Sequence, residues 1–338
     1  MKIRRYFAGL PAALTAIILL TSCAAPGGTS TAPSGSSSKA LSIGFFGASA
    51  ANSFNQAVFK GVKEAAVADG STATFVDGNF SGPQQVQQIN DAITSKQFDI
   101  IIISANDNLV VQDPLERAIK AGITVVVEFT PVGPNFDSIE PQIPGAISIV
   151  DPPVGNGKAL GQLGIQACAT VTGTCNVAYL EGFRSLPLDN ARTAAVLSTL
   201  KAAPNINVVG TAEGGYTTDQ GRTAFQNISQ ANPNINVVIG SSQAIAGAVG
   251  VADKSKNIKF VANGAPKSGV EAVKSGKWFA IYALDVVANG RKAAELGLGK
   301  ARGQSVPTAT RESDLAPNNS IGTKDALEKA NFSSGYDD

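Results

Sequence analysis

The chain contains no histidine, and this absence limits the chemistry that its other residues could perform. A Ser-His-Asp or Cys-His mechanism needs an imidazole that takes up a proton at neutral pH. The segment Gly47-Ala48-Ser49-Ala50-Ala51 follows an apolar run as a nucleophile elbow would, but it lacks the final glycine of that motif. The common hydrolase mechanisms are therefore excluded, and we expect no catalytic residues.

A glycine-rich stretch at residues 155–161, Gly-Asn-Gly-Lys-Ala-Leu-Gly, is the closest approach to a nucleotide-binding motif, with Glu181 ending a later strand. A dinucleotide fold places its glycines directly after a strand, whereas Asp151-Pro152-Pro153 intervenes here and the third glycine is one residue late. No phosphate-binding loop of the Walker type is present. We therefore expect no nucleotide and no other cofactor.

Two cysteines, Cys168 and Cys175, remain in the body of the chain once Cys23 is assigned to the N-terminal segment. Six residues separate them, and in an exported protein such a pair favours a short disulfide over two free thiols. Two cysteines without histidine do not form a zinc site, so we expect no metal.

Short apolar runs alternate with amphipathic stretches of helical length along the body. Runs such as Ile100–Ile103 are apolar throughout, which indicates strands buried on both faces and therefore a parallel sheet covered by helices. In the first half we expect strands at 41–46, 73–76, 99–104 and 123–128, and helices at 54–68, 84–96 and 109–121.

A segment rich in Pro and Gly at 130–145 interrupts this alternation, which restarts at Ala146. We expect helices at 157–170, 189–203, 218–230 and 241–252, and strands at 176–180, 208–211 and 237–239. The hexapeptide at 204–209, Pro-Asn-Ile-Asn-Val-Val, recurs at 233–238. We interpret this repeat as one βα unit, because nothing else recurs at the same period.

The first forty residues resemble an export signal. Lys2, Arg4 and Arg5 precede an apolar run at 7–20, and Leu20-Thr21-Ser22-Cys23 resembles a bacterial lipobox, which implies lipid on Cys23. The run is shorter than the roughly 20 residues of a spanning helix, so a plain membrane anchor is the weaker interpretation. Arg4-Arg5 leaves Sec and twin-arginine export both open. Residues 24–40, almost all small or polar, predict a flexible tether.

Size and charge point to two domains and a small partner. The chain has 338 residues, of which 43% are hydrophobic, and this is too long for one ordinary domain. The formal net charge is +1, so nothing favours nucleic acid or an acidic membrane surface.

The order of these features resembles the type I periplasmic binding proteins of the ribose and galactose class, over roughly Ser42 to Thr310. The resemblance implies an α/β fold with two doubly wound parallel-sheet lobes, a hinge of several chain crossings and a ligand cleft between the lobes. We expect the first lobe at 41–148 plus 285–307 and the second at 149–284 plus 308–330. The crossings are expected near 145–153, 284–286 and 305–310.

The same resemblance implies a set of ligand-binding residues at the ends of strands. This chain departs from the ribose-type pattern at several positions. Phe129-Thr130 stands where those proteins have an Asp-Arg pair, Asn263 where they have an Asp, and Leu284 where they have a Gln. Carboxylates that grip neighbouring hydroxyls are thus mostly missing, which puts a ribose or glucose site in doubt. The expected ligand-binding residues are Asn52, Phe54, Asn55, Glu128, Phe129, Arg192, Tyr216, Ser241, Asn263 and Asp285.

The function that follows from this resemblance is solute capture for an importer. We expect a monomeric lipoprotein, attached to the outer face of the cytoplasmic membrane, that passes a sugar or sugar-like solute to an ABC permease. A receptor for a less hydroxylated or carboxylated molecule, or one that reports to a sensor, is the alternative within the binding class. An exported enzyme on the same body is the alternative from another class.

Overall fold

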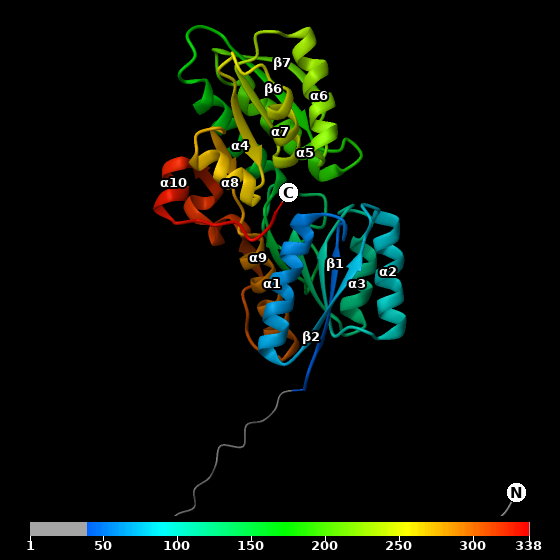
Figure 1. The fold of residues 1–338 in the computed structure, drawn as a ribbon. Coiled ribbons are helices and arrows are strands. Elements are labelled where there is room, and N and C mark those ends of the chain that lie inside the picture. The colour runs from blue at the N-terminus through cyan, green and yellow to red at the C-terminus, as the bar shows by residue number, and fades with distance from the viewer. Residues whose placement is uncertain (1–38, 338) are drawn as a thin grey trace, which may run out of the picture. The chain divides into compact units, whose positions relative to one another are not determined.

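The computed structural model describes residues 39–337. The predicted signal segment, Cys23 and nearly all of the tether lie outside the described residues. Within the described part, every expected strand and helix is present, and the order of elements is the expected alternation (Figure 1).

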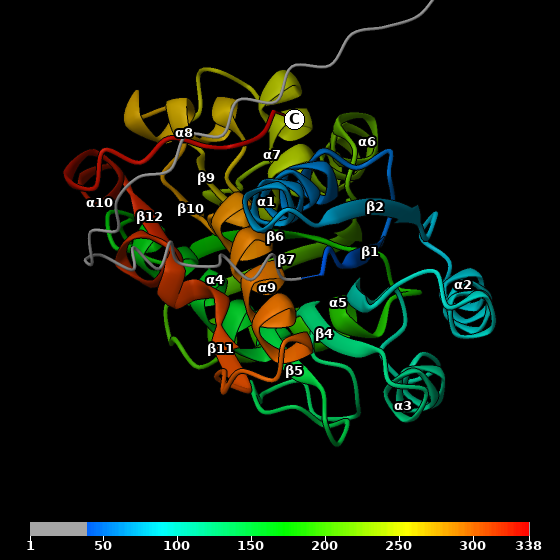
Figure 2. The same cartoon turned by 90° about the horizontal axis from the view of Figure 1, so that it is seen from below.

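The first lobe is built on a six-stranded sheet in which every neighbouring pair is parallel. Helices α1 (Ser53–Asp69) and α9 (Val286–Ala301) cover one face, and α2 (Gly82–Ser95) and α3 (Gln112–Lys120) cover the other (Figure 2). In sheet order, the strands are β2 (Thr72–Asp77), β1 (Ser42–Gly47), β3 (Ile100–Ser104), β4 (Thr124–Phe129), β5 (Ile147–Val150) and β11 (Ala309–Arg311).

The second lobe repeats this plan with a second six-stranded sheet. Its strands in order are β7 (Ile206–Glu213), β6 (Cys175–Glu181), β8 (Val237–Ser241), β9 (Lys259–Asn263), β10 (Ala280–Tyr282) and the antiparallel β12 (Ile321–Thr323). One face packs against α4 (Pro153–Cys168) and α5 (Pro187–Lys201). The other packs against α6 (Thr218–Ala231), α7 (Ser242–Val251), α8 (Lys267–Lys274) and α10 (Lys324–Lys329).

The apolar strands are buried as their sequences indicate. Every residue of β3, Ile-Ile-Ile-Ile-Ser, is buried, because helices lie on both faces of the sheet. Close helix packing adds to this core: a Cβ at Gly61 of α1 would lie 2.0 Å from the carbonyl oxygen of Val287 in α9. The prediction of two doubly wound parallel sheets is confirmed.

Three chain crossings join the lobes. Two of them lie at 151–152, between β5 and α4, and at 283–285, between β10 and α9. The third comes later than expected, because residues 309–311 form strand β11 at the edge of the first sheet. The crossing follows through two short 3-10 turns, Glu312–Leu315 and Pro317–Ser320, so the first lobe extends beyond the expected boundary at 307.

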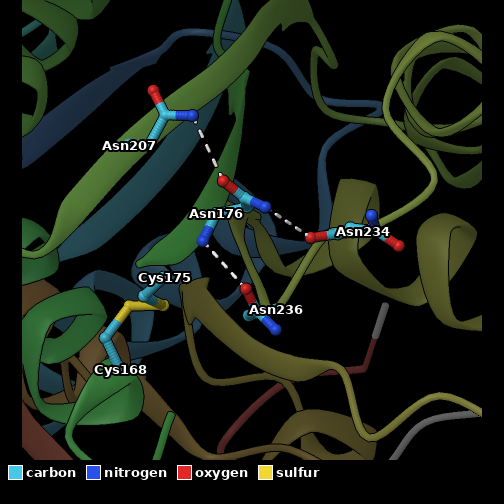
Figure 3. The surroundings of a disulfide bond; sticks show 6 residues. All are labelled: Cys168, Cys175, Asn176, Asn207, Asn234 and Asn236. Atoms are coloured by element: carbon cyan, nitrogen blue, oxygen red, sulfur yellow. Dashed lines mark hydrogen bonds between the residues drawn. A yellow bond between two sulfur atoms is a disulfide. The ribbon is translucent and has the colours of Figure 1, made fainter. Parts of the chain in front are cut away.

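The repeated hexapeptide occurs twice at the same kind of junction, where a helix ends and a strand begins, although β7 is only partly buried and β8 is buried throughout. The asparagines of the two copies flank the start of β6: Asn207 donates to Asn176 Oδ1 at 3.2 Å, and the Asn176 backbone N–H donates to Asn236 Oδ1 at 2.9 Å (Figure 3). A disulfide between Cys168 and Cys175 ties the end of α4 to β6 beside them. No helix among residues 39–337 is long and apolar enough to cross a membrane.

Candidate functional site

A cavity of about 110 Å³ lies at the carboxyl ends of the strands of both sheets. Ends of parallel strands are where ligands bind in open α/β sheets. Its lining combines aromatic and leucine side chains with amides, two serines and one guanidinium. The residues are Ala48, Asn52, Phe54, Asn55, Phe80, Ser104, Ala105, Asn106, Phe129, Leu186, Leu188, Arg192, Tyr216, Ser242, Gln243, Asn263, Gly264, Tyr282, Leu284 and Tyr336.

Arg192 is the charged centre of the second-lobe wall. It lies in the second turn of α5, buried, with its Nη1 atom 2.5 Å from Asp189 Oδ1. Tyr216 completes this contact, because its hydroxyl donates to the same Asp189 oxygen at 2.5 Å and accepts from Arg192 Nη1 at 3.2 Å. Burial opposes the charge on the guanidinium, but Tyr216 and Asp189 raise the pKa of Arg192 overall. Arg192 therefore stays charged.

Asn156 extends this network to a second strand end. Its Oδ1 accepts from Arg192 Nε at 2.6 Å, and its Nδ2 donates to Asn263 Oδ1 at 3.1 Å. Asn156 lies in the first turn of α4 and is buried. The Nε and Nη1 atoms of Arg192 thus have protein partners, while Nη2 has none among the described residues. That nitrogen is the donor available to a bound molecule.

The first-lobe wall is neutral and begins at the N-terminus of α1. Asn52 caps this helix: its Oδ1 accepts from the Asn55 backbone N–H at 3.0 Å and from Asn55 Nδ2 at 3.1 Å. Asn55 in turn accepts from the Ala48 backbone N–H at 2.8 Å. The side-chain oxygen of Asn52 therefore already accepts two hydrogen bonds, while its amide nitrogen has no partner among the described residues.

Aromatic rings form the rest of this wall. Phe54 and Phe129 have ring centroids 4.9 Å apart. Phe129 has a φ of 66°, a left-handed conformation that is costly for a bulky residue and is typical of functional sites. Phe80, also left-handed, packs against Phe183 of the second lobe with centroids 6.2 Å apart. Rings from both lobes therefore meet at the cavity.

Three buried carboxyl groups lie behind the cavity, where the chain crosses between the lobes. Glu128 accepts from the Ser104 hydroxyl, and Glu312 accepts from the Phe129 backbone N–H at 3.1 Å. Asp151 accepts from the Tyr282 hydroxyl at 2.7 Å. Burial raises the pKa of Glu128 to about 7 and that of Asp151 to about 6. Burial and the neighbouring Glu128 and Asp151 hold the pKa of Glu312 well above its usual range.

Seven of the ten predicted binding residues line the cavity: Asn52, Phe54, Asn55, Phe129, Arg192, Tyr216 and Asn263. The other three lie outside this lining and accept hydrogen bonds from neighbouring protein groups. Glu128 accepts from Ser104, Ser241 caps α7 by accepting from the Ala244 N–H at 3.1 Å, and Asp285 caps α9 by accepting from the Ala288 N–H at 3.1 Å.

The sequence prediction missed several residues of the site. Asn156 belongs to the glycine-rich stretch that fails as a nucleotide motif, and its place at the start of a helix was the signal that could have identified it. Asp189 lies three residues before Arg192, the spacing of a helical ion pair. Tyr336 lies beyond the expected end of the second lobe, and no pattern marked it. Tyr282 and Phe80 were likewise not predicted.

The lining residues offer contacts for a bound molecule. Among them are serine hydroxyls but no histidine, lysine or carboxylate that could serve as a base. Within residues 39–337, no group of three or more metal-binding side chains is assembled. What the site offers is hydrogen-bond donors and acceptors, ring faces and one positive charge.

Solved structures with the same fold include three bacterial solute-binding proteins, each under 25% identical to this chain. One, from Actinobacillus succinogenes 130z with bound D-allose, is 20% identical (TM-score 0.73) and is matched over 86% of this chain and 99% of its own. Another, from Mycobacterium smegmatis with bound glycerol, is 23% identical (TM-score 0.72) and is matched over 89% of this chain and 100% of its own. A third, from Bacillus halodurans C-125 with bound myo-inositol, is 19% identical (TM-score 0.70) and is matched over 86% of this chain and 96% of its own.

No curated protein sequence matches this chain. The family profile described as a periplasmic binding protein domain, however, matches residues 43–305. That match spans most of the two-lobed body, including both cavity walls apart from Tyr336. The chain therefore belongs to the periplasmic binding protein domain family.

Proposed function

We propose that this chain captures a small sugar or sugar-like solute outside the cytoplasmic membrane and delivers it to the permease of an ABC importer. The observation that carries the proposal is the cavity between the strand ends of two lobes, lined by rings, amides and one buried arginine. Rings offer apolar faces to the carbon-bound hydrogens of a sugar, while amides and the guanidinium bind its hydroxyls. The solved structures with bound D-allose and myo-inositol support the same class of solute.

Mass spectrometry of the solute that co-purifies with the protein tests this proposal. We expect one small polyhydroxylated compound that raises the melting temperature when it is added back, because a ligand that binds only the folded state stabilises it. Release of a chemically altered product would indicate an enzyme. Absence of both co-purified solute and any stabilising sugar would contradict the proposal.

A carboxylated solute is the second candidate, and the charge of the lining favours it. Arg192 is the one charged residue among the described residues that line the cavity, and its Nη2 atom is unpartnered there. A guanidinium binds a carboxylate strongly because the hydrogen bonds are charge-assisted. Calorimetry with an aldopyranose and the uronic acid of the same skeleton decides between the two. Tighter binding of the acid supports this candidate, and binding of the neutral sugar alone rejects it.

The proposal includes a lipid anchor at Cys23, which lies outside the described residues, and a monomeric body. The lipobox-like sequence before Cys23 supports the anchor. We expect Cys23→Ser to release the body into the medium, whereas the unaltered chain stays with the membrane fraction. Cys23→Ser protein that remains membrane-bound after washing would contradict the anchor.

A further inference from the structure

The segment that follows α10 returns to the cavity. Phe332 is buried in the core of the second lobe, and Lys274 Nζ donates to its carbonyl oxygen at 2.8 Å. Further along, the Lys267 backbone N–H donates to the Tyr336 carbonyl oxygen at 2.9 Å. These bonds fix the backbone of the segment on the second lobe, on either side of Gly335.

Tyr336 places its ring in the cavity wall. The residue is 6% exposed, and its hydroxyl accepts from the Ala265 backbone N–H at 2.8 Å. Its ring lies edge-on to Phe54 of the first lobe, with centroids 6.1 Å apart. Since Phe54 also packs on Phe129, three rings from three separate parts of the chain form one aromatic wall.

The same segment fits closely against the first lobe. A Cβ at position 335 would lie 2.4 Å from Val287 Cγ2 in the first turn of α9, so only glycine fits there without displacement. The backbone of residues 332–337 is thus bonded to the second lobe, while Gly335 and the Tyr336 ring contact the first. The segment depends on both lobes for its position.

From this arrangement we infer that Tyr336 is a solute-contacting, specificity-determining residue, held in place by residues 332–337 as a strap across both lobes. The inference rests on the proposed function and names its aromatic contact. The ring, anchored through its hydroxyl, presents a rigid apolar surface beside Phe54 and Phe129. Such a surface favours a ring-shaped solute with a face of carbon-bound hydrogens, because these hydrogens are attracted to the negative face of an aromatic ring.

Three variants test this inference with the co-purified solute and two epimers of it. We expect Tyr336→Ala to raise the Kd about tenfold or more, as the loss of a buried aromatic contact does. Tyr336→Phe keeps the ring and is expected to stay within about fivefold of the unaltered chain. Arg222→Ala, which removes an exposed ion pair with Asp219 outside both the strap and the cavity lining, is the control and should leave the Kd unchanged.

Two readouts separate solute contact from a purely structural role. Tyr336→Ala should change the ratio of Kd values between the epimers, whereas loss of packing alone would weaken all three solutes equally. Solute should also slow hydrogen exchange at the amides of Ala265 and Lys267, which donate to Tyr336. Unchanged Kd values and ratios in Tyr336→Ala would overturn the inference while solute binding stands. Absence of binding to the unaltered chain would instead overturn the proposed function.

Discussion

The two walls of the cavity differ in how their polar groups are held. In the second lobe, Arg192 is embedded in a buried network in which Asp189, Tyr216 and Asn156 occupy most of its donors. In the first lobe, Asn52 and Asn55 bond to each other and to backbone N–H groups, and rings make up the remaining surface. One wall is charged and rigidly bonded, and the other is neutral and largely apolar.

This difference teaches which part of a solute each wall can select. A guanidinium with one free nitrogen fixes the position of an oxygen atom but does not distinguish a hydroxyl from a carboxylate. The rings and amides of the first-lobe wall contact the opposite face of the solute and so select for its shape. We therefore expect affinity to depend mainly on the second wall and selectivity mainly on the first.

Removal of Arg192 should have the largest effect. Arg192→Ala is expected to weaken solute binding about ten- to a hundredfold, since a hydrogen bond to a charged group contributes roughly 1.5 to 3 kcal/mol. It also leaves Asp189, 2% exposed, as a buried carboxylate without its counter-charge, so the free energy of unfolding should fall by about 3 to 5 kcal/mol. Calorimetry and denaturant unfolding measure the two effects.

Arg192→Lys keeps the charge and separates the two effects, because an ammonium cannot maintain the same planar set of bonds. We expect it to recover most of the stability but only part of the affinity. Arg222→Ala, which breaks an exposed pair with Asp219, is the control. Unchanged solute affinity in Arg192→Lys and Arg192→Ala would place the solute elsewhere.

Asn52→Asp tests the neutral wall with a smaller expected effect. An aspartate can still cap α1, but it replaces the amide donor that faces the cavity with a second acceptor. We expect about tenfold weaker binding with little change in unfolding free energy, and a greater loss for a carboxylated solute than for a neutral one. Ser81→Asp, at the N-cap of α2 outside the cavity lining, is the matched control. Equal binding by Asn52→Asp would remove Asn52 from the site.

The carboxyl groups behind the walls should make stability depend on pH. Because the folded-state pKa of Glu128 is about 7, above its unfolded value, the folded state binds the extra proton. The stability that protonated Glu128 contributes is therefore fully present below about pH 4.5, and this contribution is lost as the pH rises through about 7. Glu312 and Asp151 act in the same direction, while Arg311 and Arg192 near Asp151 oppose it.

Glu312→Gln should reduce this dependence. A glutamine can keep the bond from the Phe129 N–H and removes one buried acid, so we expect a higher melting temperature at pH 8 and little change at pH 5. The exposed Glu140→Gln is the control. Melting curves that shift equally at both pH values would show that the carboxyl cluster does not govern the pH response.

The disulfide should have the smallest effect on binding. It joins α4 to the start of β6, at the opposite end of the strand from the cavity. Replacing both cysteines with alanine should lower the unfolding free energy by about 2 to 3 kcal/mol and leave solute affinity unchanged. Alkylation of the unreduced protein should label neither cysteine in the described body. Labelling of both would show that the bridge does not form.

Much of the fold follows from sequence because central strands such as β3 and β8 are apolar and fully buried, and several helices, such as α2 and α3, are amphipathic. The site is harder to predict, since a shift of one residue at a strand end reverses the side chain's direction. Glu128, Ser241 and Asp285 were expected in the cavity, whereas their neighbours Phe129, Ser242 and Leu284 line it. The left-handed conformation of Phe129 has no signal in the sequence, and Tyr336 reaches the site through tertiary contacts alone.

The central claim is that both walls contact the same solute, and a double-mutant cycle tests it most directly. Calorimetry with the co-purified solute would compare the unaltered chain, Asn52→Asp, Arg192→Lys and the double variant. We predict that each single variant binds more weakly and that the two losses do not add, because both residues hold one molecule in a single closed site. A loss confined to one variant, or two losses that add fully in the double variant, would contradict the account.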